Sequence, residues 1–131
     1  MNYLVDTSVA LWTVTEDRRL SRRARKILSS SASSLYFSSA SVWEIAIKYF
    51  SGDLPLHSKP EVFIPEMLRA MRMQPLDITQ THAIEAGRLP RIHGDPFDRM
   101  LVAQASCEPL VLLTADENLT KYPVRHVYCG K

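Results

Sequence analysis

Hydrophobic residues along the chain form two alternating patterns, and each pattern predicts one kind of element. Short apolar runs predict buried strands, whereas apolar residues spaced three and four apart predict helices. Strands are predicted at residues 3–5, 35–37, 110–113 and 125–128, and residues 74–78 are predicted to form a further strand or an extended segment. Helices are predicted at residues 9–14, 18–28, 42–50, 61–71 and 79–89, and one more begins at Pro96 and is stopped by Pro109. The alternation predicts an α/β fold in which helices cover both faces of a central, mostly parallel sheet of four to five strands.

Two of these helices differ in how deeply we expect them to be buried. The helix at 18–28 is amphipathic, because its apolar residues share one face and arginine and lysine residues cover the other. The helix at 42–50 is apolar on nearly every side, so we expect it to be largely buried. Glu44 is its exception, and two interpretations stay open: an ion pair with Lys48 four residues further on, or a carboxylate that points inward.

The composition fits one compact domain over residues 1–131. The chain is 46% hydrophobic, enough for a core without disulfide or metal staples, and its formal net charge of +2 permits a polyanionic substrate. The histidines and cysteines are too far apart in sequence for a zinc cluster, so we expect reduced thiols. No apolar stretch approaches the roughly 18 residues of a membrane span, and we expect a cytoplasmic protein with no membrane partner.

Asp98 stands out at the start of the last helix. Asp95 can cap that helix, and Pro96 fits its first position, where no N–H group is needed. Asp98 then shares a face with Leu101, Val102 and Ala105, so its carboxylate points toward the apolar side. A carboxylate in such a place must be paired or bound to a cation.

Two further acids, Asp6 and Asp116, directly follow predicted strands. Each has an ordinary explanation as a helix-capping or first-turn acid, and Thr114 with Glu117 fits a capping box for a helix after the fourth strand. The carboxyl ends of parallel strands, however, meet at one edge of a sheet. We therefore expect Asp6, Asp98 and Asp116 to meet there, with Glu44 as a fourth acid.

Carboxylates brought this close repel one another unless a cation joins them or their pKa values rise. Oxygen ligands without histidine or thiolate indicate Mg²⁺ or Mn²⁺. Such a site suits phosphodiester hydrolysis, in which the metal generates hydroxide and stabilises the leaving oxygen. The chain has no glycine-rich phosphate loop or dinucleotide fingerprint, so nucleoside-triphosphate and hydride chemistry lack support.

Four ordered stretches resemble PIN-domain nucleases, close to VapC-type toxins. They read Leu-Val-Asp-Thr-Ser at 4–8, Ser-Val-Trp-Glu-Ile-Ala-Ile-Lys at 41–48, Asp-Pro-Phe-Asp-Arg-Met-Leu-Val-Ala-Gln-Ala at 95–105 and Leu-Thr-Ala-Asp-Glu-Asn-Leu at 113–119. The resemblance spans nearly the whole chain. It implies a PIN-like three-layer α/β/α sandwich, a metal-dependent endoribonuclease that cuts RNA, a VapB-like antitoxin partner and a homodimer.

The resemblance also implies roles for particular residues. Asp6, Glu44, Asp98 and Asp116 correspond to the family's acidic quartet, with metal binding assigned most firmly to Asp6 and Asp98. Asp95 accompanies the motif and is kept here as a helix cap. Three hydroxyls are expected to orient a carboxylate or a water: Thr7, Ser8 and Thr114. The candidate RNA contacts are Arg22, Arg23, Lys48 and Arg99.

Other functions remain as alternatives. A PIN-type nuclease could equally serve housekeeping RNA processing or DNA cleavage, and the sequence does not separate these from a toxin. A receiver-like signalling domain would need an acidic pair after the first strand and a lysine after the last, whereas Asp6 is followed by Thr7 and Ser8. A haloacid-dehalogenase-like phosphatase fits poorly, because Ser8 stands where its second aspartate should be.

Overall fold

The fold is built around β1 (Asn2–Val5), the middle strand of a five-stranded sheet in a computed structural model that describes residues 1–131. The strand order is β3-β2-β1-β4-β5, and all neighbouring strands are parallel. The other strands are β2 (Ser34–Ser38), β3 (Met73–Leu76), β4 (Val111–Thr114) and β5 (His126–Tyr128). The predicted parallel sheet is therefore confirmed, with five strands.

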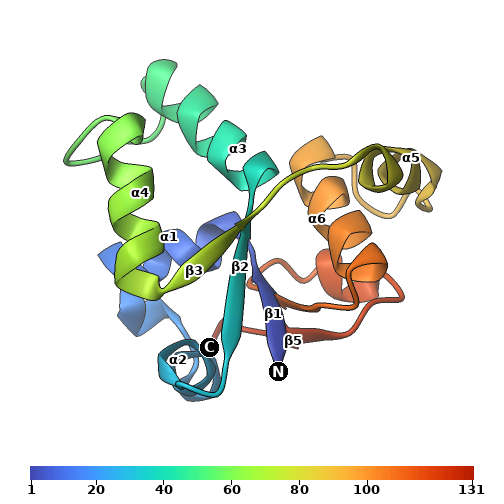
Figure 1. The fold of residues 1–131 in the computed structure, drawn as a ribbon, viewed down its shortest axis with the longest axis horizontal. Coiled ribbons are helices and arrows are strands. Elements are labelled where there is room, and N and C mark those ends of the chain that lie inside the picture. The colour runs from blue at the N-terminus through green and yellow to red at the C-terminus, as the bar shows by residue number, and fades with distance from the viewer.

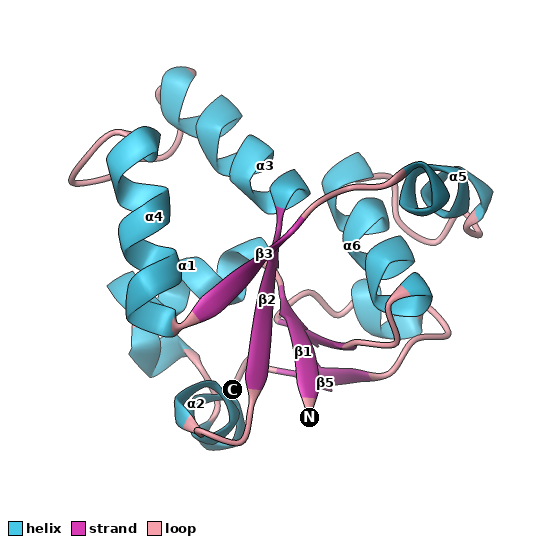
Figure 2. Cartoon of the chain, viewed as in Figure 1, coloured by secondary structure: helices cyan, strands magenta, loops and turns pink.

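Side chains on alternating positions of β1 enter two separate cores. Tyr3 and Val5 belong to the larger core, whereas Leu4 belongs to the smaller one on the opposite face. Helices α1 (Thr7–Thr15), α2 (Arg22–Ser29), α3 (Ser39–Phe50) and α4 (Pro60–Met71) lie on the side of the larger core, and α5 (Gln80–Arg88) and α6 (Pro96–Cys107) lie on the other (Figure 1). Three layers result, with strands between two groups of helices (Figure 2).

The strand order reverses at β1, which places the candidate site. The chain passes from β1 outward through β2 to β3, then returns through α5 and α6 to β4 on the other side of β1. At such a reversal the following connections leave in opposite directions and open a crevice at the carboxyl ends of the strands. Asp6 follows β1 at this point, and its backbone N–H group donates to the Leu113 carbonyl of β4 at 3.0 Å.

The predicted helix at 18–28 is wrong in its extent, because the chain is extended at Leu20 and Ser21. A 3-10 helix, η1 (Asp17–Arg19), precedes the break, and Ser21 caps α2 by accepting from the Ala24 N–H group. The Ser21 N–H group donates to the Cys129 carbonyl at 2.8 Å, and Leu20 bridges Gly130. The break is stabilised by a segment more than a hundred residues further along the chain.

The expectation that the helix at 42–50 is largely buried is also wrong for one of its faces. Trp43, Ile47 and Phe50 are 62%, 45% and 70% exposed, and their spacing of four and three aligns them on the outer side of α3. Glu44 and Ile45 face inward instead. An all-apolar helix pattern does not specify which face is covered, and here one side packs against the fold while the other stays open.

The helix that would make Asp116 an ordinary first-turn acid after the fourth strand does not form. The Thr114 hydroxyl accepts from the Asp116 N–H group, and Asp116 accepts from the Asn118 N–H group. These local bonds make a turn, after which only a short 3-10 helix, η2 (Leu119–Lys121), follows. None of the helices combines the length and the apolar character needed to cross a membrane.

His82 ties α5 to α6 through a buried hydrogen-bond network. Its Nδ1 accepts from the Thr79 N–H group at 3.1 Å, while the Thr79 hydroxyl accepts from the His82 N–H group, so the pair forms a reciprocal cap of α5. With Nδ1 accepting, Nε2 carries the proton and donates to Glu108 at 2.7 Å. Gln104 of α6 also reaches Nδ1, at 3.4 Å.

We expect His82→Ala to lower the free energy of unfolding by about 2–4 kcal/mol, because it removes a helix cap and leaves buried polar groups without partners. Urea unfolding followed by circular dichroism measures the loss. His57→Ala is the matched control, since His57 is exposed. A loss in His82→Ala no larger than in the control would contradict the role assigned to this network.

Candidate active site

Asp6 is held at the junction of the two middle strands. One carboxylate oxygen accepts from the Val9 N–H group at 2.8 Å and so caps α1, and the other accepts from the Ala115 N–H group at 3.3 Å. The carboxylate is buried, and burial raises the pKa of Asp6 to about 6 even though hydrogen bonds from the Thr114 hydroxyl and the backbone act in the opposite direction. The charge of Asp116 adds to this rise. Asp6 is thus both a helix cap and a member of an acidic cluster.

Asp98 lies in the first turn of α6, as the helix pattern predicts. Leu101, Val102 and Ala105, which share its face, are buried. Burial and, after it, the charges of Asp95, Glu44 and Asp6 together raise the pKa of Asp98 to about 7, against a lowering hydrogen bond from His93. The carboxyl group of Asp98 therefore experiences the charges of the acid that caps its own helix and of acids from two other parts of the chain.

Asp116 lies in the turn after β4 and completes a tight group with Asp98 and His93. His93 Nε2 is 3.0 Å from Asp98 Oδ2 and 3.4 Å from Asp116 Oδ2. These three residues each offer one ligand atom, and the three atoms all lie within 4.8 Å of one another. The other Asp116 oxygen accepts from the Asn118 N–H group at 2.9 Å, which fixes its orientation.

Glu44 combines the two interpretations that its sequence position allows. Its side chain is buried, and Oε2 accepts from the Lys48 ammonium group at 2.7 Å, a bond that raises the pKa of Lys48. Its other oxygen, Oε1, is buried without any hydrogen-bond partner. Glu44 is therefore an inward carboxylate and an ion-pair partner at the same time.

The site fits a divalent cation on the chemistry of its donors. Carboxylates converge from the cap of α1, from α3, from α6 and from the turn after β4. Glu44 Oε1 and Thr7 Oγ1 are buried polar atoms without hydrogen-bond partners. Buried polar atoms rarely stay unpaired, and a cation could bind Glu44 Oε1. It would also offset the burial and, to a smaller extent, the repulsion that raise the pKa values of Asp6 and Asp98. Asp6 and Glu44 lie outside the tightest group of ligand atoms and act on Asp98 through their charge.

The three hydroxyls expected near the carboxylates have different environments. The Thr114 hydroxyl bonds to Asp6 and accepts from the Asp116 N–H group at 3.0 Å, so it joins two acids. Thr7 is buried and its hydroxyl is unpaired, while Ser8 is exposed and lines a cavity of about 470 Å³ together with Asp116. Asp95 caps α6 by accepting from the Phe97 and Asp98 N–H groups, as predicted.

The basic residues expected to contact RNA are distributed over the molecule. Lys48 lies beside Glu44 with half of its side chain exposed. Arg99 donates to the carbonyls of Ala86, Leu89 and Pro90, so its guanidinium holds the connection between α5 and α6. Arg22 and Arg23 are exposed on α2 and form no salt bridge with the acidic cluster.

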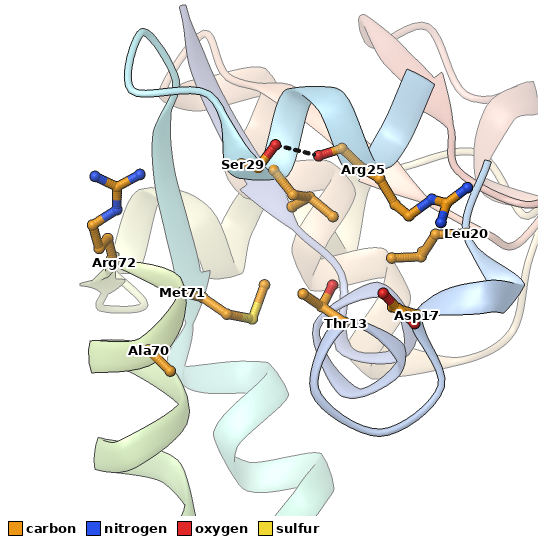
Figure 3. A pocket seen from close by; sticks show the side chains of 9 residues that line it. Thr13, Asp17, Leu20, Arg25, Ser29, Ala70, Met71 and Arg72 are labelled. Carbon is orange, nitrogen blue, oxygen red and sulfur yellow. Dashed lines mark hydrogen bonds between the residues drawn. The ribbon is translucent and has the colours of Figure 1, made fainter. Parts of the chain in front are cut away.

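A separate cavity of about 450 Å³ lies between α1, α2 and the end of α4 and contains none of the clustered acids. Leu20 and Met71 line it with Arg25 and Arg72, as Figure 3 shows. The Ser29 hydroxyl donates to the Arg25 carbonyl at 2.9 Å on its wall (Figure 3). This cavity is therefore distinct from the acidic site.

His93 is the one member of the site that sequence reasoning missed. Its separation from the other histidines argued against a metal cluster, but a mixed histidine and carboxylate group needs only one histidine. The available signal was its place five residues before Asp98, in the same loop that starts α6.

Comparisons with known proteins identify the family. A family model described as the PIN domain matches residues 3–124, so the chain belongs to the PIN-domain family, whose members are nucleases. This membership excludes the receiver-like and phosphatase alternatives. A search of curated protein sequences found no match.

Solved structures share the fold over nearly the whole chain. One is described as VapBC2 from Rickettsia felis bound to a DNA fragment from their promoter (TM-score 0.74, 15% identity, 97% of this chain and 98% of that chain covered). Another is described as DNA-bound VapBC from Salmonella typhimurium (TM-score 0.67, 20% identity, 97% of each chain covered). A third is described as VapBC-1 from nontypeable Haemophilus influenzae (TM-score 0.62, 16% identity, 97% of each chain covered). At these identities the similarity shows a common fold.

The raised pKa of Asp98 makes the metal-free protein sensitive to pH. Because this pKa of about 7 lies above the ordinary 3.8, the folded state binds the proton more tightly than the unfolded state, and stability falls as pH rises from about 4 to 7. We expect Asp98→Asn to be more stable than the wild type at pH 8, by roughly 3 °C or more in melting temperature, and less different from it at pH 4.

Thermal melts in the presence of a chelator at the two pH values measure this effect. Asp53→Asn is the control, because Asp53 is an exposed acid in the loop after α3. An Asp98→Asn variant that is no more stable than the wild type at pH 8 would show that Asp98 is not held in an unfavourable charged state.

Proposed function

We propose that this chain is a metal-dependent endoribonuclease that acts as the toxin of a VapBC-type toxin–antitoxin pair. The observation that carries the proposal is the convergence of Asp6, Glu44, Asp98 and Asp116 on one edge of the sheet. Membership of a nuclease family supports the hydrolytic activity. The similarity of fold to structures described as VapBC complexes supports the toxin role and a VapB-like antitoxin partner.

In this proposal Asp6 and Asp98 hold Mg²⁺ or Mn²⁺, and Asp116 and Glu44 complete the site. When bound, such an ion supplies an activated water and neutralises charge that develops on the phosphate. The protein contributes ligands whose positions are set before the substrate arrives. Asp6 is fixed by two backbone N–H groups and by Thr114, and Asp116 by Asn118. Such preorganised groups need no rearrangement during the reaction.

Lys48 is the basic residue best placed to meet a phosphate at this site. Its ammonium group donates a hydrogen bond to Glu44, and the charges of Asp95 and Asp98 help to raise its pKa. The Lys48 side chain is half exposed. An ammonium group at the edge of an acidic pocket offsets the repulsion between the carboxylates and an incoming phosphodiester. Arg22, Arg23 and Arg99 are proposed as further RNA contacts on the basis of their charge alone. The guanidinium group of Arg99 also donates hydrogen bonds to three backbone carbonyls.

Two alternatives share the same site chemistry. A housekeeping RNA-processing enzyme or a DNA-cleaving enzyme would use the same four carboxylates, so the geometry does not favour one substrate. RNA as substrate, a homodimer and a cytoplasmic location are proposed here from the family resemblance.

We expect Asp98→Asn to reduce divalent-dependent cleavage of RNA by at least about a hundredfold, since the amide removes a ligand and a negative charge from the site. Purified protein is assayed on RNA and on single-stranded DNA with Mg²⁺, Mn²⁺ or a chelator, and its circular dichroism is compared with the wild type. Asp53→Asn should cleave at the wild-type rate. Undiminished cleavage by folded Asp98→Asn would contradict the proposed site, and cleavage of DNA alone would contradict the proposed substrate.

A toxin role also predicts an effect on the growth of bacterial cells. Induced expression of the wild-type chain should arrest bacterial growth, expression of Asp98→Asn should not, and co-expression of a small neighbouring antitoxin gene should restore growth. Colony counts after induction provide the measurement. If the wild-type chain cleaves RNA in vitro but cells grow normally, the housekeeping alternative is favoured.

A further inference from the structure

His93 is held in the acidic site by its own backbone. Its N–H group donates to the Tyr122 hydroxyl at 2.9 Å, and that hydroxyl donates back to the His93 carbonyl at 3.4 Å. Tyr122 is buried in the smaller core. The loop residue is therefore anchored on both sides of its Cα atom by one buried side chain, and the imidazole is presented to the carboxylates from a fixed position.

The imidazole points one nitrogen at two carboxylates. Nε2 lies 3.0 Å from Asp98 Oδ2 and 3.4 Å from Asp116 Oδ2. Neighbouring ligands of an octahedral ion that binds at about 2.1 Å are about 3 Å apart, which is close to both separations. The three ligand atoms all lie within 4.8 Å of one another, so they are close enough to bind one ion.

The other ring nitrogen makes no hydrogen bond within the protein, whereas Nδ1 of His82 accepts two. In the metal-free protein, Nε2 of His93 carries a proton and donates it to Asp98, whereas Nδ1 has no partner. A cation between the three groups would replace that proton, and Nδ1 can then carry the proton of the neutral ring while the lone pair of Nε2 binds the ion. A second observation indicates that the acidic site binds a ligand: Glu44, whose charge acts on Asp98, is only 6% exposed, and its Oε1 atom has no hydrogen-bond partner.

We propose that His93 Nε2 is a further ligand of the divalent cation of the acidic site, beside Asp98 and Asp116, and that this nitrogen makes the site prefer Mn²⁺ over Mg²⁺. The inference rests on the proposed function, in that it requires the acidic site to bind a divalent ion. Mg²⁺ prefers oxygen ligands and gives up its water reluctantly, whereas imidazole binds first-row transition ions more readily. No member of the acidic quartet would create this preference, because all four offer oxygen.

A purely electrostatic role for His93 predicts the opposite effect of its removal on metal affinity. If the ring is only a positive partner for the two carboxylates, it competes with the metal, and its removal strengthens binding of both ions. If it is a ligand, its removal weakens Mn²⁺ binding more than Mg²⁺ binding. The change in the ratio of the two affinities therefore separates the two roles.

The experiment titrates Mn²⁺ and Mg²⁺ into wild-type protein, His93→Ala and the control His57→Ala by isothermal calorimetry. We expect His93→Ala to lose on the order of tenfold in Mn²⁺ affinity and much less in Mg²⁺ affinity, with His57→Ala unchanged. Electron spin-echo spectra of bound Mn²⁺ should show coupling to a histidine nitrogen in the wild type and in His57→Ala, and lose it in His93→Ala.

The wild-type spectrum keeps the inference testable even if His93→Ala does not fold. Bound Mn²⁺ without nitrogen coupling overturns the inference, as does equal or tighter Mn²⁺ binding by folded His93→Ala. In either result the proposed nuclease stands if Asp98→Asn still abolishes Mn²⁺ binding. Wild-type protein that binds neither ion overturns both the inference and the proposed metal dependence.

Discussion

Repulsion between carboxylates at one edge of the sheet is the constraint on which the rest of the site depends. Asp6 and Asp98 are partly or fully removed from water, and each lies within the field of other acids, so their pKa values rise toward neutrality. A fold gains no stability from such an arrangement, which costs free energy whenever the groups are charged. The fold tolerates it because the same groups have structural uses: Asp6 caps α1, and the turn at Asp116 is closed by its own carboxylate.

The sheet topology creates this crowding. β1 lies between β2 and β4, and connections leave it on both sides. The residue that follows β1 must therefore sit beside the residue that follows β4, whatever the side chains are. α6 returns from the far side of the sheet and brings Asp98 to the same edge, while α3 brings Glu44 with an oxygen that no group in the chain satisfies. The backbone topology alone therefore brings these acids together, and the edge of the sheet where they meet is the expected functional site.

Much of this arrangement could be predicted from local sequence patterns. The apolar runs identify β1, β2 and β4 to within about a residue, because a strand buried on both faces needs apolar side chains at successive positions. β3 and β5 are the edge strands and are partly exposed, and they lie within about two residues of the predicted segments. The meeting of Asp6, Asp98 and Asp116 also followed from sequence, since parallel strands place their carboxyl ends together. Asp95 was expected to cap α6, and it does.

What the sequence did not reveal depends on contacts between distant segments. The break at Leu20 and Ser21 requires the backbone of Cys129 and Gly130, and no local pattern encodes that pairing. The open face of α3 could not be told from its covered face, because both are apolar. His93 lies in the site because the loop that carries it is anchored by a hydrogen bond to Tyr122. Its neighbours in sequence identified a helix start and gave no indication that the imidazole would reach Asp116.

The most direct test is to titrate the side-chain carboxyl groups of Asp98 and Asp6 with pH and to monitor them by carbon NMR. The titration is done on the metal-free protein and repeated with Mg²⁺, which is diamagnetic. We expect Asp98 to titrate near neutrality without the ion, and we expect a divalent cation to lower its pKa well toward the acid range. An Asp98 that titrates at its ordinary value without the ion, and does not respond when the ion is added, would contradict the claim that these acids are assembled to hold a cation.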